Sequence, residues 1–242
     1  MITVQIPDKG AKKKRKARVL GVFSFRYDAH LVPGLLQNIE PMVDGWVAFD
    51  DRGSRETFSN EPARRYELLK RARAEGADWA LAIDPDERLE RRLAHAMPEL
   101  TAAEGLVAYS LPLREMFAPH AYRVDGIWGH KRQCRLIRLT DTISPDVSAL
   151  HSSWHSLVPG SSLRVADYNI YHLKMMTPER RRGRRDLYKH LDPDRQIQQM
   201  GYDYLADEEG LELETVPFGR DFRPSYEEDN GMWMAEVHAP PR

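Results

Sequence analysis

The chain has 242 residues, of which 41% are hydrophobic and 30% charged, and its formal net charge is -1 at pH 7. This composition excludes wholesale disorder and fits one α/β domain, with or without a small appendage. The near-zero net charge gives no overall attraction to nucleic acid or to a membrane surface. The single cysteine, Cys134, excludes an internal disulfide and a zinc site built from several cysteines.

The sequence predicts neither a secretion signal nor a membrane span. Its N-terminal region is positively charged but has no apolar segment behind it. No apolar run approaches the roughly eighteen residues needed to cross a bilayer. We therefore expect a soluble, cytoplasmic protein, and one cysteine agrees with a reducing compartment.

The first 90 residues predict alternating strands and helices after a basic, flexible tail over residues 1–17. Apolar runs without polar alternation indicate buried strands, and the segments between them have helical spacing. The predicted elements are strands at 19–25, 46–49 and 79–83 and helices at 31–40 and 62–76. This order favours a parallel, doubly wound sheet with right-handed crossovers, so residues 18–90 are interpreted as a nucleotide-binding half.

The second half is less regular, and no Gly/Ser-rich or Pro-rich linker separates it from the first. The pattern predicts strands at 105–113 and 133–139 with a loop at 117–130 between them, then an extended segment at 163–173 and a helix at 178–191. Thr177 is expected to cap that helix. We predict one domain over residues 18–217, with 91–217 as its smaller half and 218–242 as a C-terminal tail.

Carboxylates follow two of the predicted strands, at Asp50-Asp51 and at Asp84-Pro85-Asp86-Glu87. Ligands of open α/β sheets bind at the carboxyl ends of the strands. Asp-x-Asp brings two hard oxygen ligands together, which suits Mg²⁺ or Mn²⁺ on a substrate diphosphate, while another carboxylate can bind a ribose or base. The alternative is an ordinary polar turn, because Asp-Pro commonly starts turns.

Three histidines and one arginine-rich run are further candidates. His172 lies in an extended apolar segment and could complete a metal site, although a structural role is the commoner one. His151 and His155 flank Trp154 and could act as a base or remain ordinary loop residues. The run from 180 to 185 contains five arginines, which suit phosphate but also a solvated helix face.

In order and spacing, these segments resemble family 2-type glycosyltransferases of the GT-A fold over roughly residues 18–175. The resemblance rests on the strand from Val19, on Val47-Ala-Phe-Asp-Asp-Arg-Gly-Ser54, on the helical Ala63-Arg-Arg-Tyr66 and on Asp78-Trp-Ala-Leu-Ala-Ile-Asp-Pro-Asp-Glu87. Arg135-Leu-Ile-Arg138 resembles a later strand with basic residues. The family's fold would be a doubly wound mixed sheet with a nucleotide-binding half and an acceptor-side half.

The resemblance implies a metal-dependent transfer of a sugar from a nucleotide-sugar donor to an unidentified acceptor, which could be a glycan, a lipid-linked group or a nucleic acid. By position, the nucleotide would be bound by Asp50, Asp51, Arg65 and Asp84. Mn²⁺ or Mg²⁺ would be bound by Asp84, Asp86 and His172. The family commonly has an acidic catalytic base where this chain has Ser156 after His155, so His155 is the first choice for the base and Asp146 the second.

Two other functions fit the sequence. The basic residues 12–16 and 180–185 could bind nucleic acid, which the near-neutral net charge disfavours. The chain could also keep the GT-A fold without catalysis, given its unusual base region. Markers of metalloproteases, serine hydrolases, P-loop NTPases and NAD-binding proteins are absent from the sequence.

Overall fold

The computed structural model describes residues 1–6, 17–54, 61–145, 153–196 and 198–229. Its α-helices are α1 (Val32–Ile39), α2 (Glu61–Ala74), α3 (Leu93–Thr101) and α4 (Pro178–Leu191). Short 3-10 helices are η1 (Ala29–Leu31), η2 (Trp128–His130), η3 (Trp154–Leu157), η4 (Leu173–Met175) and η5 (Asp203–Leu205). The strands are β1 (Ile2–Gln5), β2 (Val19–Phe25), β3 (Trp46–Asp50), β4 (Trp79–Ala82), β5 (Glu87–Leu89), β6 (Val107–Ala118), β7 (Ala121–Arg123), β8 (Arg132–Arg138), β9 (Ser162–Val165), β10 (Ile170–His172) and β11 (Leu213–Thr215).

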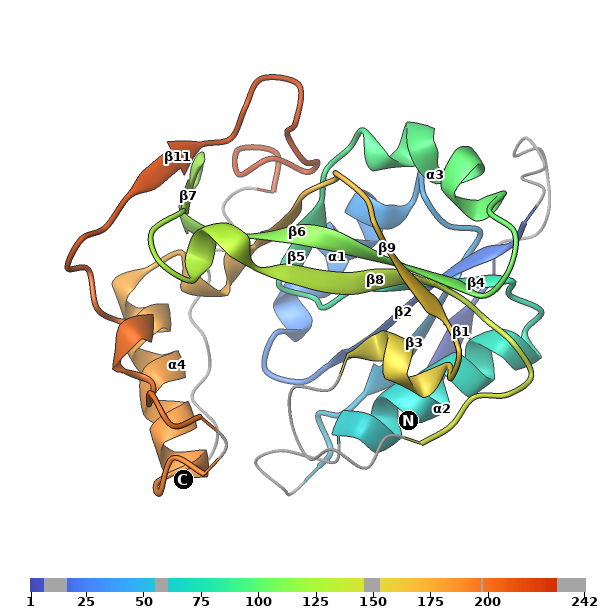
Figure 1. The fold of residues 1–242 in the computed structure, drawn as a ribbon, viewed down its shortest axis with the longest axis horizontal. Coiled ribbons are helices and arrows are strands. Elements are labelled where there is room, and N and C mark those ends of the chain that lie inside the picture. The colour runs from blue at the N-terminus through green and yellow to red at the C-terminus, as the bar shows by residue number, and fades with distance from the viewer. Residues whose placement is uncertain (7–16, 55–60, 146–152, 197, 230–242) are drawn as a thin grey trace.

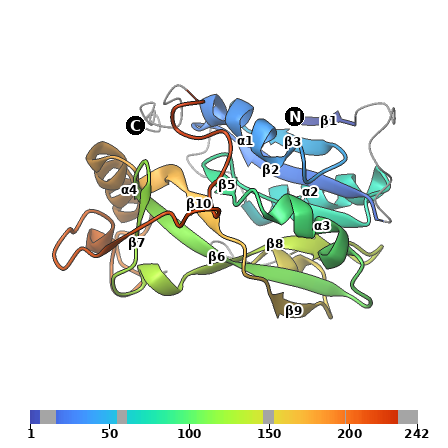
Figure 2. The same ribbon diagram turned by 90° about the horizontal axis from the view of Figure 1, so that it is seen from above.

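The strands form a mixed sheet whose main path runs β1-β3-β2-β4-β8-β6-β10-β5 (Figures 1 and 2). Strand β2 pairs in parallel with both β3 and β4, so these three strands end at the same edge, as the sequence predicts. Strand β8 is antiparallel to both β4 and β6. The protein is therefore α/β with an open, mixed sheet.

Helices cover both faces of this sheet. On one face, α1 and α3 pack through Leu35, Ile39 and Met97 against the side chains of Val19 and Phe23. On the other face, α2 and η3 pack against the intervening residues of the same strand, Leu20 and Val22. Because successive strand residues point to opposite faces, a strand that is apolar throughout is buried by both layers. This arrangement is compatible with the predicted doubly wound fold.

The boundaries of the predicted helices are close to those observed. Helix α4 begins at Pro178 as expected, and the side chain of Thr177 accepts a hydrogen bond from the backbone N–H of Arg180 at 3.2 Å. Helix α2 ends before Gly76, whose φ of +80° suits a residue without a side chain.

Three predictions about local structure are wrong, and one helix was not predicted. Residues 2–5 are not a flexible tail, because β1 pairs with β3, whereas residues 7–16 lie outside the described part. The loop predicted at 117–130 contains β7 and η2. The segment at 163–173 is divided into β9 and β10, which contact different parts of β6. Helix α3 was not predicted, and it carries Pro98 within its span.

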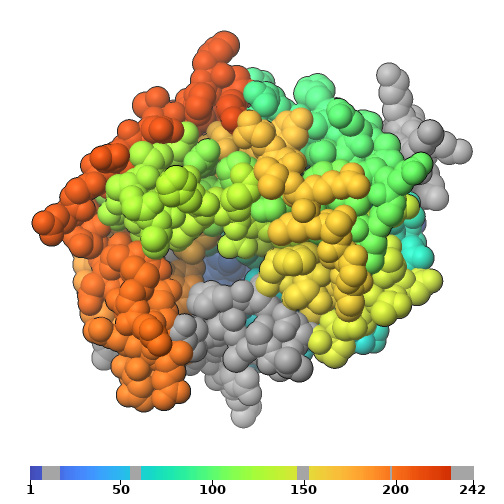
Figure 3. Space-filling model, viewed as in Figure 1, coloured from blue at the N-terminus to red at the C-terminus, as the bar shows by residue number. Residues whose placement is uncertain are grey.

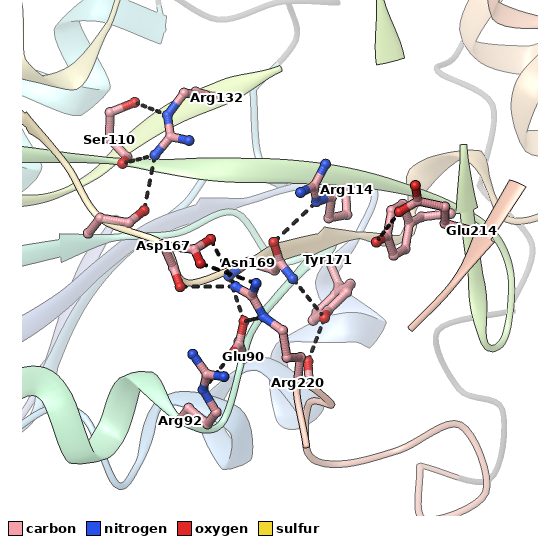
Figure 4. A network of polar contacts seen from close by, with 12 residues as sticks. Glu90, Arg92, Ser110, Arg114, Arg132, Asp167, Asn169, Tyr171, Glu214 and Arg220 are labelled. Carbon is pink, nitrogen blue, oxygen red and sulfur yellow. Dashed lines mark hydrogen bonds and ion pairs between the residues drawn. The ribbon is translucent and has the colours of Figure 1, made fainter. Parts of the chain in front are cut away.

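The C-terminal segment from 218 to 229 has neither helix nor strand, yet polar contacts bind it to the sheet (Figure 4). The guanidinium of Arg220 lies 2.9 Å from Glu90 and 3.1 Å from Asp167. Asn38 on α1 donates a hydrogen bond to the carbonyl oxygen of Arg223 at 2.7 Å. The segment predicted as a tail is therefore packed over its described part. No helix in the described part of the chain is long and apolar enough to cross a membrane.

Candidate functional site

The acidic turn after β4 lies beside β10 because of the register of the sheet. Strand β10 lies between β5 and β6, with His172 opposite Glu87 on β5 and Glu115 on β6. The backbone N–H of Leu173 donates to the carbonyl oxygen of Asp86 at 2.7 Å, which fixes the turn against the end of β10. Residues far apart in the sequence thus meet at this edge.

The imidazole of His172 lies between two carboxylates. Its Nε2 is 3.3 Å from Oδ2 of Asp86, and its Nδ1 is 3.1 Å from Oε2 of Glu115. All three residues are buried, with Glu115 only 1% exposed. Asp86 and His172 were both predicted as metal ligands, and the structure brings them together. Glu115 was not predicted, although a charge inside the apolar strand 107–118 was the available signal.

Basic side chains form an outer layer around this group. Lys131 and Lys174 approach the same oxygen of Glu115, at 3.5 and 3.9 Å. From α4, Arg184 comes within 3.8 Å of Asp86. The side chains of Lys131, Lys174 and Arg184 are 27%, 19% and 28% exposed, so these cations lie nearer to solvent than the acids.

Asp84 and Glu87 have a different partner. The Arg135 guanidinium on β8 donates to Asp84 at 2.9 Å and to Glu87 at 2.5 Å. Glu87 also accepts a hydrogen bond from the backbone N–H of Asp84 at 3.0 Å, which closes the turn. Arg135, which lies on the strand predicted at 133–139, therefore holds the acidic turn in place.

The charges at the site shift one another's pKa values. Burial opposes ionisation of Asp86 and Glu115, but nearby His172 and basic side chains hold the pKa of each carboxyl well below its usual range. Burial likewise opposes the imidazolium form, yet the two carboxylates raise the pKa of His172 to about 9. The two carboxylates thus favour the imidazolium, whereas metal binding requires the neutral imidazole.

A further carboxylate near the turn, that of Asp28, comes from the connection between β2 and η1. Burial, and then the charges of Asp86 and Asp84, raise the pKa of Asp28 to about 7. Its Oδ1 accepts a hydrogen bond from the backbone N–H of Arg26 at 3.0 Å. Figure 3 shows a hollow between α4, drawn in orange, and strands drawn in green, with blue atoms from the first part of the chain at its floor. No sequence signal marked Asp28.

The two acids after β3 have different environments. Asp50 is bound by its neighbour Arg52 at 2.7 Å, which lowers the pKa of Asp50 to about 2. Asp51 is buried and lies 3.5 Å from Arg64 and 4.0 Å from Arg26. Asp51 is therefore buried between two arginines, whereas the side chain of Asp50 is 28% exposed and is paired with Arg52. Their nucleotide-binding role stays a prediction.

The remaining predicted residues belong to the α2 side of the sheet or are not described. Arg65 pairs with Glu61, and its guanidinium lies 4.9 Å from the ring centre of Trp154. His155 Nδ1 is 2.6 Å from the hydroxyl of Ser153. Asp146 and His151 lie outside the described residues. The identity of a catalytic base therefore stays a prediction.

The donor types at the turn suit Mn²⁺ or Mg²⁺, since they are carboxylate oxygens and one imidazole. Glu115 beside His172 has the place of a carboxylate that orients a metal-bound histidine. Within the described ranges, however, no three His, Cys, Asp or Glu side chains form a metal-binding group. Asp84 is held by Arg135 and Asp86 by His172. The donor set fits a divalent metal in type, but its members would have to exchange partners to coordinate one.

The arginine-rich run does not form a uniformly exposed face. Arg180 and Arg181 are buried and donate to the carbonyl oxygens of Leu173 and Met175 at 3.3 and 2.9 Å. Their neighbour Arg182 is exposed and bonded to Glu179. These contacts show that α4 is anchored by two of its arginines and turns a third, Arg184, toward the acidic turn.

Comparison with known proteins does not assign this arrangement to a family. The site therefore rests on its own geometry: an acidic turn at the carboxyl edge of a parallel strand, a histidine beside it and a layer of basic side chains around both. No protein-family model matches the chain, and a search of curated proteins also found no match.

Proposed function

We propose that the chain is a metal-dependent glycosyltransferase with a GT-A-like fold, which moves a sugar from a nucleotide-sugar donor to an acceptor. One observation carries this proposal: Asp86 and His172, 86 positions apart in the sequence, lie 3.3 Å from each other at the carboxyl edge of the sheet. This is the edge at which open α/β sheets bind nucleotides. The family that the sequence resembles has the same order along the chain: two carboxylates, and then a metal-binding histidine nearer the C-terminus.

In this proposal Asp84, Asp86 and His172 would hold Mn²⁺ or Mg²⁺, and the metal would supply a positive charge to stabilise a departing diphosphate. Glu115 orients His172, and Arg135 holds the turn through Asp84 and Glu87. Asp51, with Arg65 farther along the chain, is the nucleotide-binding candidate, and Asp50 is the weaker one because Arg52 binds it at the surface. The base that activates the acceptor is His155 or Asp146.

The test is a thermal-shift screen of nucleotide sugars with Mn²⁺ and with EDTA. We expect one donor to stabilise the wild type only with metal, and Asp86→Asn to lose that stabilisation. The matched control is Asp203→Asn, which changes an exposed aspartate bonded to Lys189. If Asp86→Asn binds metal and nucleotide as well as the wild type does, the proposed site is wrong.

The structure gives little support to nucleic-acid binding as the alternative. Arg180 and Arg181 are only 4% and 3% exposed, so they are not available to a phosphate backbone. Residues 12–16, the other basic segment, lie outside the described residues. Binding to generic DNA and RNA that weakens steeply with salt would favour this alternative. A GT-A-fold protein without catalysis would bind a nucleotide sugar but would not hydrolyse it. Hydrolysis of the donor during a long incubation without acceptor would argue against this alternative.

A further inference from the structure

Three basic side chains surround the two buried acids Asp86 and Glu115. Lys131 and Lys174 lie 3.5 and 3.9 Å from Glu115, and Arg184 lies 3.8 Å from Asp86, while the charge of Asp28 also acts on Arg184. Lys174 and Arg184 are close enough to repel each other. A bound divalent cation would add positive charge beside this partly buried basic layer, and the added charge would favour an anionic ligand there.

The contacts of these cations are loose. Arg184 lies 3.8 Å from Asp86 and Lys174 lies 3.9 Å from Glu115, which are ion-pair rather than hydrogen-bond distances. Within the described residues, neither carboxylate oxygen of Glu115 has a hydrogen-bond partner, although Glu115 is almost fully buried. By contrast, Arg135 is locked to Glu87 at 2.5 Å. The outer cations are therefore attracted to the acids without being held by oriented hydrogen bonds.

We propose that Arg184 and Lys174 bind the diphosphate of the donor and that, without it, Arg184 competes with the metal for Asp86. This inference rests on the proposed function and extends it to a second set of residues. A guanidinium is a planar fork that matches phosphate oxygens, so a diphosphate is a better partner for Arg184 than a carboxylate 3.8 Å away. When Arg184 turns to the diphosphate, Asp86 loses a competing cation and binds the metal more strongly.

Metal and diphosphate therefore bind cooperatively, through an exchange of partners. The exchange is reciprocal by thermodynamic linkage, because each ligand must raise the affinity for the other by the same factor. This exchange is consistent with the ligand-free structure, in which no three His, Cys, Asp or Glu side chains of the described residues are arranged to bind a metal. The ligand-free arrangement holds Asp86 with cations, and the loaded arrangement gives it to the metal.

Calorimetry on the full chain tests this proposal with MnCl₂ alone, with inorganic pyrophosphate in EDTA, and with pyrophosphate in excess Mg²⁺. Arg184→Gln should weaken pyrophosphate binding in EDTA about tenfold, as expected for loss of one charged hydrogen-bonding group. The same variant should bind Mn²⁺ alone several-fold more tightly, because Asp86 has lost a competing cation. Lys174→Gln should also weaken pyrophosphate binding. In the wild type, Mg²⁺ should strengthen pyrophosphate binding by about fivefold or more.

Arg182→Gln is the matched control, since it removes one positive charge from the same helix at an exposed residue bonded to Glu179. It should change neither affinity. If Arg184→Gln weakens Mn²⁺ binding, or leaves pyrophosphate binding unchanged, the competition is refuted. If Arg184→Gln and Arg182→Gln weaken pyrophosphate binding equally, the loss reflects only the net charge of the helix, and the proposed role of Arg184 is also refuted. Pyrophosphate binding that depends on Arg184, without binding of any nucleotide sugar, would support the cationic site while refuting the glycosyltransferase.

Discussion

Replacing Arg135 by methionine would remove the charge that neutralises a buried acid. The side chains of Arg135 and Glu87 are 4% and 1% exposed, whereas that of Asp84 is 37% exposed. Breaking a buried ion pair from one side costs about 3–5 kcal/mol, because the remaining charge stays buried without its partner. The more exposed contact with Asp84 adds about 0–1 kcal/mol. We therefore expect Arg135→Met to lower the free energy of unfolding by about 3–5 kcal/mol, mostly through Glu87.

Urea denaturation followed by tryptophan fluorescence measures this loss, since the chain has five tryptophans. The double variant Arg135→Met/Glu87→Gln should recover most of the stability, because it leaves no buried charge without a partner. Arg138→Met is the control on the same strand, where the guanidinium donates to the carbonyl of Ala103, and should cost about 1 kcal/mol. A loss below about 1 kcal/mol for Arg135→Met, or no recovery in the double variant, would refute the reasoning.

Three further substitutions test other parts of the fold by urea denaturation. Gly34→Ala should cost about 1–3 kcal/mol, because its new Cβ would lie 2.5 Å from the buried guanidinium of Arg88; no loss would show that Arg88 can move. Thr177→Ala removes the N-cap of α4 and should lower the free energy of unfolding by about 1 kcal/mol. An unchanged free energy of unfolding would contradict this prediction. Burial raises the pKa of Asp28 to about 7, from 3.8. The folded state thus holds a proton that the unfolded state releases, and in EDTA stability should fall from pH 4 to pH 7. Asp28→Asn should remove about 1–3 kcal/mol of that fall, and an unchanged pH profile would contradict it.

The elements of the first half could be predicted because their physical signals are local. Strands 19–25 and 79–82 are apolar on both faces, which only burial between two layers of helices explains. The structure confirms their parallel pairing. Strand β1 gave a weaker signal, since its four residues alternate between intermediate and exposed, as expected of a short edge strand. Helix α3 was missed because Pro98 within a helix removes a hydrogen bond and usually predicts a break.

The candidate site could be predicted only where its residues are neighbours in the sequence. Asp84 and Asp86 are recognisable as a pair, and His172 was included by its place in an apolar segment. Glu115 reaches His172 only through the pairing of β6 with β10, and a register shifted by one residue would put it on the opposite face. A run of arginines likewise does not reveal which member turns inward. In the structure Arg180 and Arg181 anchor α4, and Arg184 faces Asp86.

The three carboxylates of the turn differ in how firmly each is held, and this difference separates support from chemistry. Glu87 is fully buried and locked to Arg135, so it can leave its partner only at a large cost. From the other side, the buried Arg88 donates to the carbonyl oxygens of Pro85 and Glu87 at 2.9 and 2.8 Å, which fixes the backbone of the turn. Asp86 lies between these two arginine contacts, and its charged neighbours stand at 3.3 and 3.8 Å. A rigid backbone with one loosely paired carboxylate is what a site needs if that carboxylate is to exchange a side-chain partner for a metal without unfolding the turn.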